Sequence, residues 1–139
     1  MGFSILKTVG TLLIFRKPIM QQVDLYFKLR IEDKLLRKEK EGFNYYVRGE
    51  YEKAILSYQE VLAVRKKNPE QQYVDIASLL ASLGRVYSDQ NNFRKAKEAY
   101  AEALSIAKKR IEKNATFVKN IEKTIIHISS IQQIERRHR

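Results

Sequence analysis

Apolar residues recur three or four positions apart along almost the whole chain, which is the spacing of one face of an α-helix. Turn-forming residues interrupt this pattern at Gly49-Glu50, Asn68-Pro69 and Gln90-Asn91-Asn92. Proline cannot continue a helix, and glycine and asparagine tolerate the left-handed backbone that ends one. The pattern therefore predicts a first helix, or two abutting helices, from Ile19 to about Arg48, followed by helices from Tyr51 to about Lys67, from Tyr73 to Asp89 and from Phe93 to about Lys113.

A last amphipathic helix is expected after Asn114. Its apolar residues form one stripe along the helix, and its tip is basic. No later helix follows to cover the stripe, so homodimerisation through this helix is one alternative that the sequence leaves open. The stripe consists of Val118, Ile121, Ile125, Ile128, Ile131 and Ile134.

Residues 42–67 and 84–109 carry the same apolar frame, offset by 42 positions. Small residues in the frame let two helices approach closely, and aromatic residues fill the space that remains. A tandem unit of this size is typical of stacked helical hairpins. The matching pairs are Gly42 and Gly84, Tyr45 and Tyr87, Tyr51 and Phe93, Ala54 and Ala96, Tyr58 and Tyr100, Leu62 and Leu104, and Val64 and Ile106.

Composition agrees with a helical repeat and excludes several chemistries. The chain has 139 residues, the length of one domain, and only five glycines and two prolines, which favours helix throughout and no sheet. It contains no cysteine. Disulfides, zinc–thiolate sites, iron–sulfur clusters and thiol catalysis are therefore excluded.

The repeated residues resemble tetratricopeptide repeats, in particular the 42-residue variety typified by kinesin light chain. The first copy departs from the pattern at Lys38 and Glu41, as expected of a terminal unit with a partly solvated face. In the second copy the resemblance rests on Asp75-Ile76-Ala77, Leu80, Leu83-Gly84, Tyr87, Phe93, Ala96, Tyr100, Ala103-Leu104 and Ile106.

This resemblance implies an all-α fold, a short α-solenoid of antiparallel helical hairpins. We expect about two tetratricopeptide units, with an N-terminal helix before them and a C-terminal capping helix after them. In residue numbers, the N-terminal basic, amphipathic segment would occupy 1–34 and the tandem hairpins 35–113, at about 35–68 and 77–110. The capping helix would occupy 114–139.

In the family, the first helix of each hairpin lines a concave groove that holds peptides or partner helices. Phe43, Tyr46 and Arg85 are of the residue types enriched at binding hot spots. The lysine and asparagine set that clamps a C-terminal carboxylate in some relatives is missing, because Phe43 and Arg85 stand on that surface. By this resemblance the groove would present Leu36, Glu39, Phe43, Tyr46, Ala81, Arg85, Ser88 and Asp89, with Asn120, Lys123 and His127 from the third helix.

Positive charge is concentrated at the two ends of the chain. The net charge is +11, of which residues 1–40 contribute +5 and residues 108–139 contribute +6, while residues 41–107 are neutral. Attraction to an anionic partner would therefore come from the ends. Simple solubility explains basic ends equally well.

The first 17 residues contain no acidic residue and an apolar run that Arg16, Lys17 and Pro18 end. The run has about 13 residues, short of the roughly 20 that a membrane-spanning helix needs. It resembles an organellar presequence or an interfacial anchor, or else it caps the first hairpin. Membrane contact would involve Phe3, Leu6, Lys7, Leu12, Leu13, Phe15, Arg16 and Lys17.

No pattern in the chain indicates catalysis. His127 and His138 are the only histidines and have no ligand-spaced companion, and no phosphate loop, nucleophile elbow or zinc-helix motif occurs. We expect no enzyme activity, no catalytic residue, no metal site and no cofactor.

Together these features predict a protein–protein interaction module, an adaptor or assembly scaffold that binds a peptide or partner helix in its groove. A peripheral membrane-associated assembly factor, anchored to an anionic surface by the N-terminal segment, is the alternative. Nucleic-acid binding is the weakest interpretation, because the aromatic residues lie in the neutral part of the chain and not among the basic residues. We expect an intracellular, cytoplasmic protein, with organellar or peripheral membrane association as the other localisation.

Overall fold

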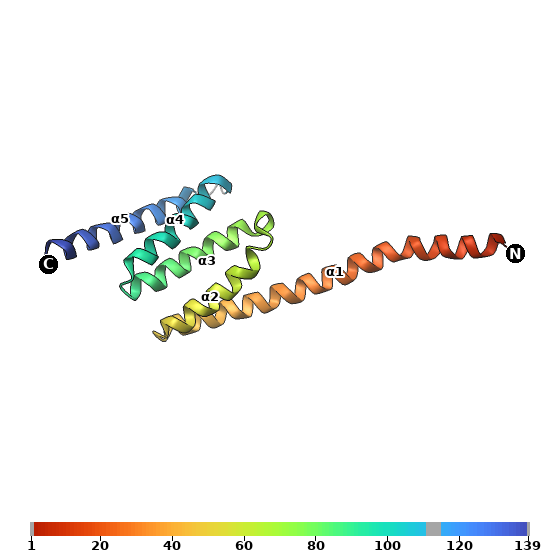
Figure 1. Ribbon diagram of the computed structural model, residues 1–139, viewed down its shortest axis with the longest axis horizontal. Coiled ribbons are helices and arrows are strands. Elements are labelled where there is room, and N and C mark those ends of the chain that lie inside the picture. The colour runs from red at the N-terminus through yellow and green to blue at the C-terminus, as the bar shows by residue number, and fades with distance from the viewer. Residues whose placement is uncertain (1, 111–114, 139) are drawn as a thin grey trace. The chain divides into compact units, whose positions relative to one another are not determined.

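A computed structural model describes residues 2–110 and 115–138, with side chains for 16–69, 72–109 and 116–138. Within these residues the chain forms helices and no strand, which confirms the all-α prediction (Figure 1). The helices are α1 (Gly2–Val47), α2 (Tyr51–Arg65), α3 (Pro69–Asp89), α4 (Phe93–Arg110) and α5 (Ala115–Arg137).

The N-terminal helix α1 is a single helix of 46 residues, which settles whether one helix or two precede the first turn. It passes through Pro18. Proline removes one backbone hydrogen bond from a helix interior, so the helix is locally weakened at this point.

The chain divides into two compact units, Met1–Arg37 and Lys38–Arg139, and α1 contributes to both. The repeats lie in the second unit. There, residues 38–47 of α1 form the first helix of hairpin 1 and α2 forms its second helix, while α3 and α4 form hairpin 2. Helix α2 packs on α3, α3 on α4 and α4 on α5, which is the order of a stacked array.

The turns inside the two hairpins have the same backbone hydrogen bonds. In hairpin 1, Gly49 N donates to Tyr46 O and Glu50 N donates to Tyr45 O, both at 2.9 Å. In hairpin 2, the equivalent bonds run from Asn91 N to Ser88 O at 2.9 Å and from Asn92 N to Tyr87 O at 2.8 Å. Gly49 (φ +76°) and Asn91 (φ +59°) supply the left-handed residue that this helix ending requires.

Each hairpin closes around a glycine and a tyrosine. A Cβ placed on Gly42 would lie 2.8 Å from the Tyr58 ring, and a Cβ placed on Gly84 would lie 2.9 Å from the Tyr100 ring. Ala54 and Ala96 are fully buried on the partner helices. These contacts confirm that the small residues of the repeated frame allow close helix approach and that the tyrosines fill the core.

Pro69 ends one hairpin and begins the next. Helix α2 stops at Arg65, and Pro69 occupies the first turn of α3, where its missing N–H costs no hydrogen bond. Helix α3 therefore begins four residues before the predicted Tyr73. A non-helical residue, Gln72 (φ −131°, ψ 18°), kinks it near the predicted start.

Helix α5 packs on the end of the stack, at the position that the first helix of a third hairpin would occupy. Ile121 and Ile128 are buried, as are Leu79 and Val86, which precede them by 42 residues in α3. The centre of the isoleucine stripe thus belongs to the core of the chain and is not open for a dimer contact. Ile126, at the position equivalent to Gly84, is instead 67% exposed.

Candidate protein-binding groove

Apart from Leu36, the residues expected to line the groove come from three helices in the second unit. Glu39, Phe43 and Tyr46 follow one another on α1 at helical spacing and therefore share one face of the helix. Arg85, Ser88 and Asp89 occupy the corresponding part of α3, and Lys123 and His127 lie on α5. The three sets therefore lie on equivalent faces of α1, α3 and α5, the helices that stand first in their repeats.

A hydrogen bond joins the first two sets across the two hairpins. The Tyr46 hydroxyl donates to Asp89 Oδ2 at 2.7 Å. This bond, together with partial burial, raises the pKa of Tyr46 to about 12, since ionisation would destroy the donor. Phe43 packs beside Tyr46, with their ring centroids 6.4 Å apart, and is 53% exposed. Phe43 and Tyr46, two of the residues predicted for the groove, thus lie beside each other on one face of α1.

Arg85 lies near the hydroxyl ends of three tyrosines. Burial raises the pKa of Tyr58 and Tyr100, and the positive charge of Arg85 opposes part of this rise in both. The same charge also opposes the rise in the pKa of Tyr46. Arg85 thus places a cation beside these tyrosines while remaining solvent-exposed itself.

A pocket of about 300 Å³ opens between α3 and α5, over α4. We call it the α3–α5 pocket. Its walls combine apolar side chains with hydroxyl and amide groups, and Arg85 is the one charged residue among the described residues that line it. It is lined by Ser78, Ala81, Ser82, Arg85, Tyr100, Phe117, Asn120, Ile121 and Thr124.

Some of the predicted groove residues meet and others do not. Tyr46 and Asp89 are in direct contact, and Ala81, Arg85 and Asn120 share the α3–α5 pocket. Lys123 and His127 are exposed on α5 but do not line the pocket, and Ser88 is half-buried. Leu36 is exposed and belongs to the first unit, Met1–Arg37.

Six of the pocket residues were not predicted for the groove: Tyr100 and Ile121 were assigned only to the repeat frame and the isoleucine stripe, and four others were missed altogether. Ser78 and Ser82 precede Arg85 by seven and three positions on the predicted helix, so helical spacing alone places them on its face. Phe117 and Thr124 come from the N-terminal half of α5 and reach the pocket because α5 packs where the first helix of a third hairpin would lie. That packing could be anticipated from the repeat offset, but the α5 sequence retains little of the repeat pattern.

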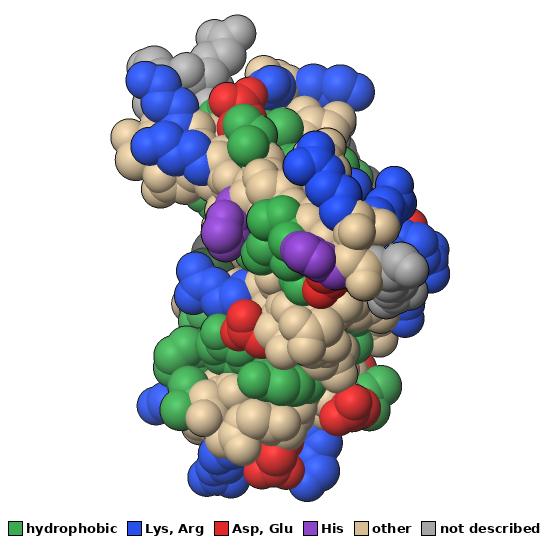
Figure 2. All heavy atoms as spheres, turned by 90° about the vertical axis from the view of Figure 1, so that its left-hand side faces the viewer, with side chains coloured by type: hydrophobic (Ala, Val, Ile, Leu, Met, Phe, Trp, Pro, Cys, Tyr) green, Lys and Arg blue, Asp and Glu red, His purple; other side chains and the backbone are tan. Residues whose placement is uncertain are grey.

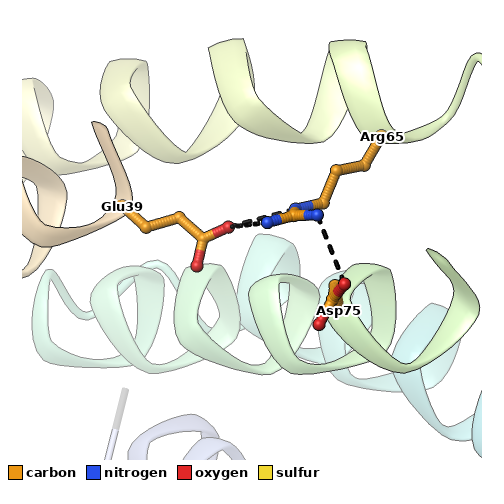
Figure 3. A network of polar contacts seen from close by, with 3 residues as sticks. All are labelled: Glu39, Arg65 and Asp75. Atoms are coloured by element: carbon orange, nitrogen blue, oxygen red, sulfur yellow. Dashed lines mark hydrogen bonds and ion pairs between the residues drawn. The ribbon is translucent and has the colours of Figure 1, made fainter. Parts of the chain in front are cut away.

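A buried arginine ties the groove helix α1 to both hairpins (Figure 3). Arg65, on α2, has a side chain only 3% exposed, and its Nε and Nη2 donate to Glu39 Oε1 at 3.1 and 2.9 Å. Its Nη1 donates to Asp75 Oδ2 on α3 at 3.2 Å. Glu39, which was expected to face a partner, is therefore engaged inside the protein.

The repeat offset contains a signal for this network. Arg65 stands 42 positions before Ala107, which is fully buried. A charged residue at a position that the other copy fills with a buried alanine requires a compensating partner.

Hydrophobic side chains lie exposed among basic and acidic ones on the face shown in Figure 2. In the first unit, one stretch of α1 also exposes apolar side chains next to charged ones. Arg16 and Lys17, two of the residues named for membrane contact, are exposed there. The side chains of Phe3, Leu6, Lys7, Leu12, Leu13 and Phe15 lie outside the described residues. The exposed apolar residues of this run are Ile19, Met20, Val23, Leu25, Tyr26, Phe27, Leu29 and Ile31.

Neither a metal-binding cluster nor a membrane-spanning helix occurs in the described part of the chain. Among those residues, no group of three or more histidine, aspartate or glutamate side chains is placed to hold a metal ion. Over the same residues, no helix has both the length and the apolar character needed to cross a bilayer.

The tetratricopeptide repeat family model matches residues 38–109, more than half of the chain. The match begins at the first residue of the second unit and ends at the last turn of α4, so it covers both hairpins. A comparison with curated proteins found no match.

Proposed function

The chain belongs to the tetratricopeptide repeat family, a family of protein–protein interaction modules, and we propose that it is a non-catalytic adaptor or assembly scaffold. In this proposal a peptide or partner helix lies along the faces of α1, α3 and α5. We also infer that the repeats are of the 42-residue kinesin-light-chain-like subtype. The equivalent turns at Gly49 and Asn91 support this assignment, since they are 42 residues apart.

The observation that carries the proposal is the arrangement around Arg85. An exposed phenylalanine, a tyrosine fixed by a hydrogen bond and an exposed arginine beside a pocket provide apolar contact, rigidity and a directional charge. Interfaces concentrate their binding energy in such aromatic and arginine side chains. An aromatic residue that served only to fill the core would be buried, as Tyr58 and Tyr100 are, whereas Phe43 is exposed.

Affinity capture from native lysate tests the proposal. The intact protein is compared with a triple variant, Phe43→Ala, Tyr46→Ala and Arg85→Ala. A matched control replaces Leu56, Val74 and Arg94, which are also exposed, with alanine. We expect a specific client to be lost by the groove variant and kept by the control. Capture that ignores the groove substitutions would contradict the proposal.

We propose peripheral membrane association as a second function of the first unit. Exposed apolar residues between Ile19 and Ile31, accompanied by Lys28 and Arg30, support it, because an interfacial helix combines apolar burial with attraction to anionic lipid. The test is co-sedimentation with vesicles of phosphatidylcholine and phosphatidylglycerol. Replacing Ile19, Val23 and Phe27 with serine should reduce binding at least tenfold, and unchanged binding would refute the proposal.

A further inference from the structure

We propose that a second pocket of the repeat unit, between α3 and α4, binds a small carboxylate with a compact apolar body, of the kind that a medium-chain fatty acid presents. We call it the α3–α4 pocket. None of the described residues that line it was predicted for the groove, so this proposal goes beyond the proposed function and does not depend on it. It is carried by the shape of the pocket, its apolar floor and the charges on its rim.

Three segments of the second unit form the α3–α4 pocket. Its volume is about 440 Å³, which is larger than that of the α3–α5 pocket and within the range of small-molecule sites. The end of α2 contributes Lys66. Helix α3 contributes a stripe at helical spacing, formed by Pro69, Tyr73 and Ile76. Helix α4 contributes one face, formed by Glu102, Ser105, Ile106 and Lys109.

The floor of the pocket is apolar. Ile76 is only 2% exposed, and Tyr73 and Ile106, which line the pocket as well, are half-buried. Pro69 adds a rigid apolar wall where α3 begins. A ligand with an apolar body of about ten non-hydrogen atoms suits such a pocket, because removing its surface from water favours binding without a polar partner.

An ion pair occupies part of the rim. Lys66 Nζ and Glu102 Oε1 lie 2.7 Å apart, so this pair joins the end of α2 to α4. Glu102 is the one carboxylate among the described residues that line the pocket, and it is committed to Lys66. The pocket therefore offers no carboxylate of its own that a cationic ligand could use without breaking this ion pair.

The other polar groups of the rim are uncommitted. Within the described residues, no carboxylate lies within 4.0 Å of the Lys109 ammonium, and the hydroxyl groups of Ser105 and Tyr73 make no hydrogen bond. Ser129 and Ser130, in contrast, each donate to the carbonyl four residues earlier. Ser105 and Lys109 are four positions apart on α4 and therefore neighbours on its surface. One ammonium beside hydroxyl donors matches a single carboxylate, whose two oxygens accept several hydrogen bonds.

The repeat itself does not require this polar rim. The position equivalent to Ser105 in hairpin 1 holds Ala63, and both residues are exposed on the second helix of their hairpin. A hydroxyl at this position is therefore not needed for the packing of the hairpin. Ala63 also provides a matched control position outside the pocket.

Titration of the full chain with monomeric decanoate, followed by proton–nitrogen correlation NMR, tests the proposal. We expect saturable shifts of backbone amides in 66–76 and 102–109, the segments that form the pocket. The expected Kd is about 0.1–1 mM, as for a ligand of about a dozen non-hydrogen atoms in an open pocket. Decyltrimethylammonium, which has the same chain with a cationic head, and acetate, which lacks the chain, should each bind at least about tenfold more weakly.

Matched variants assign the binding to the pocket. Ser105→Phe should fill the pocket and abolish the saturable shifts, whereas Ala63→Phe should leave them unchanged. Lys109→Gln should weaken decanoate binding about three- to tenfold and reduce the preference over the cationic ligand, because the head group loses its charged partner. Lys123→Gln removes an exposed cation on α5 that does not line the pocket and should change neither value. All four positions are exposed, and circular dichroism checks that each variant is folded.

The possible outcomes separate this proposal from the proposed function. Shifts confined to the exposed apolar residues of α1 between Ile19 and Ile31 would mean that decanoate adsorbs to that helix, and they would overturn the proposal. Equal binding of decanoate and decyltrimethylammonium, or shifts that survive Ser105→Phe, would also overturn it. None of these results affects the groove, whose test is the loss of a captured client.

Discussion

The two hairpins share one backbone plan but are held together by different side chains. In hairpin 2, Leu80 and Leu83 are buried, and Asn92 accepts a hydrogen bond from Lys95 N at the start of α4. In hairpin 1 the equivalent leucine positions hold Lys38 and Glu41. Lys38 reaches Glu60 of α2 at 3.1 Å and Glu41 at 3.6 Å, and the bond to Glu60 raises the pKa of Lys38.

This difference separates the residues that every hairpin needs in order to close from the residues that depend on which helices pack beside the hairpin. The glycine–tyrosine contact and the turn hydrogen bonds occur in both hairpins, because each hairpin needs them to close. The leucines occur only in hairpin 2. Helix α3 packs against both α2 and α4, whereas the repeat portion of α1 begins the array, so its outer positions can remain polar.

The largest expected change in stability tests whether α5 is docked on the stack through its buried isoleucines. Ile128→Ala should lower the free energy of unfolding by about 2–5 kcal/mol, because this side chain is 1% exposed and truncation leaves a cavity. Ile126→Ala, on the open face, should change it by less than about 0.5 kcal/mol. Urea unfolding followed by circular dichroism measures both. Equal effects would mean that α5 is not docked as the third helix of the stack.

The next effect tests whether both hairpins close in the same way. Gly84→Ala and Gly42→Ala each place a methyl group against a buried tyrosine ring, at 2.9 and 2.8 Å. Overpacking of this kind costs about 1–3 kcal/mol, from which a gain of about 1 kcal/mol in helix propensity must be subtracted. Thermal unfolding should show similar losses for the two variants. A loss in only one hairpin would break the equivalence.

A smaller effect compares the turns. Gly49→Ala should destabilise the protein by about 1–2 kcal/mol, since alanine disfavours the left-handed conformation that Gly49 adopts, and no steric contact is involved. Asn91→Ala should cost less, because Asn91 already carries part of this strain in the native protein. Chemical denaturation would show the ranking, and a larger loss at Asn91 would reverse it.

The smallest effect concerns the link between the hairpins. Tyr46 has a pKa of about 12 in the folded protein, against about 10 in an unfolded chain. The neutral hydroxyl is the stabilising form, so its contribution is complete below about pH 10 and is lost as the pH rises toward 12. The stability difference between the native protein and Tyr46→Phe, at most about 1 kcal/mol, should therefore shrink over that range. A constant difference would exclude ionisation of Tyr46 as the cause.

Most of the fold followed from the sequence because its determinants are local or repeated. Gly49 and the Asn91 turn mark helix ends through backbone preference alone, and the 42-residue offset paired Gly42 with Gly84 before any contact was known. The start of α3 was misplaced because Pro69 can end one helix and begin another, and the sequence does not say which role dominates.

The candidate site was only partly predictable. The repeat frame placed Tyr46, Arg85 and Asp89 on equivalent faces, but the choice of Asp89 as partner of Tyr46 depends on the distance between hairpins. The contribution of Phe117 depends on how α5 docks. The involvement of Glu39 with Arg65 could not be read from helix faces, because it requires three helices to meet.

The Arg65 network also bears on how the molecule folds and unfolds. Stacked repeats can in principle melt one after another, since each contacts only its neighbours. Arg65, however, is anchored in hairpin 1 by Glu39 and in hairpin 2 by Asp75, so separating the hairpins would take a carboxylate partner away from a buried guanidinium. This penalty couples the repeats energetically. The two hairpins should therefore melt in a single cooperative transition, without a populated half-folded intermediate.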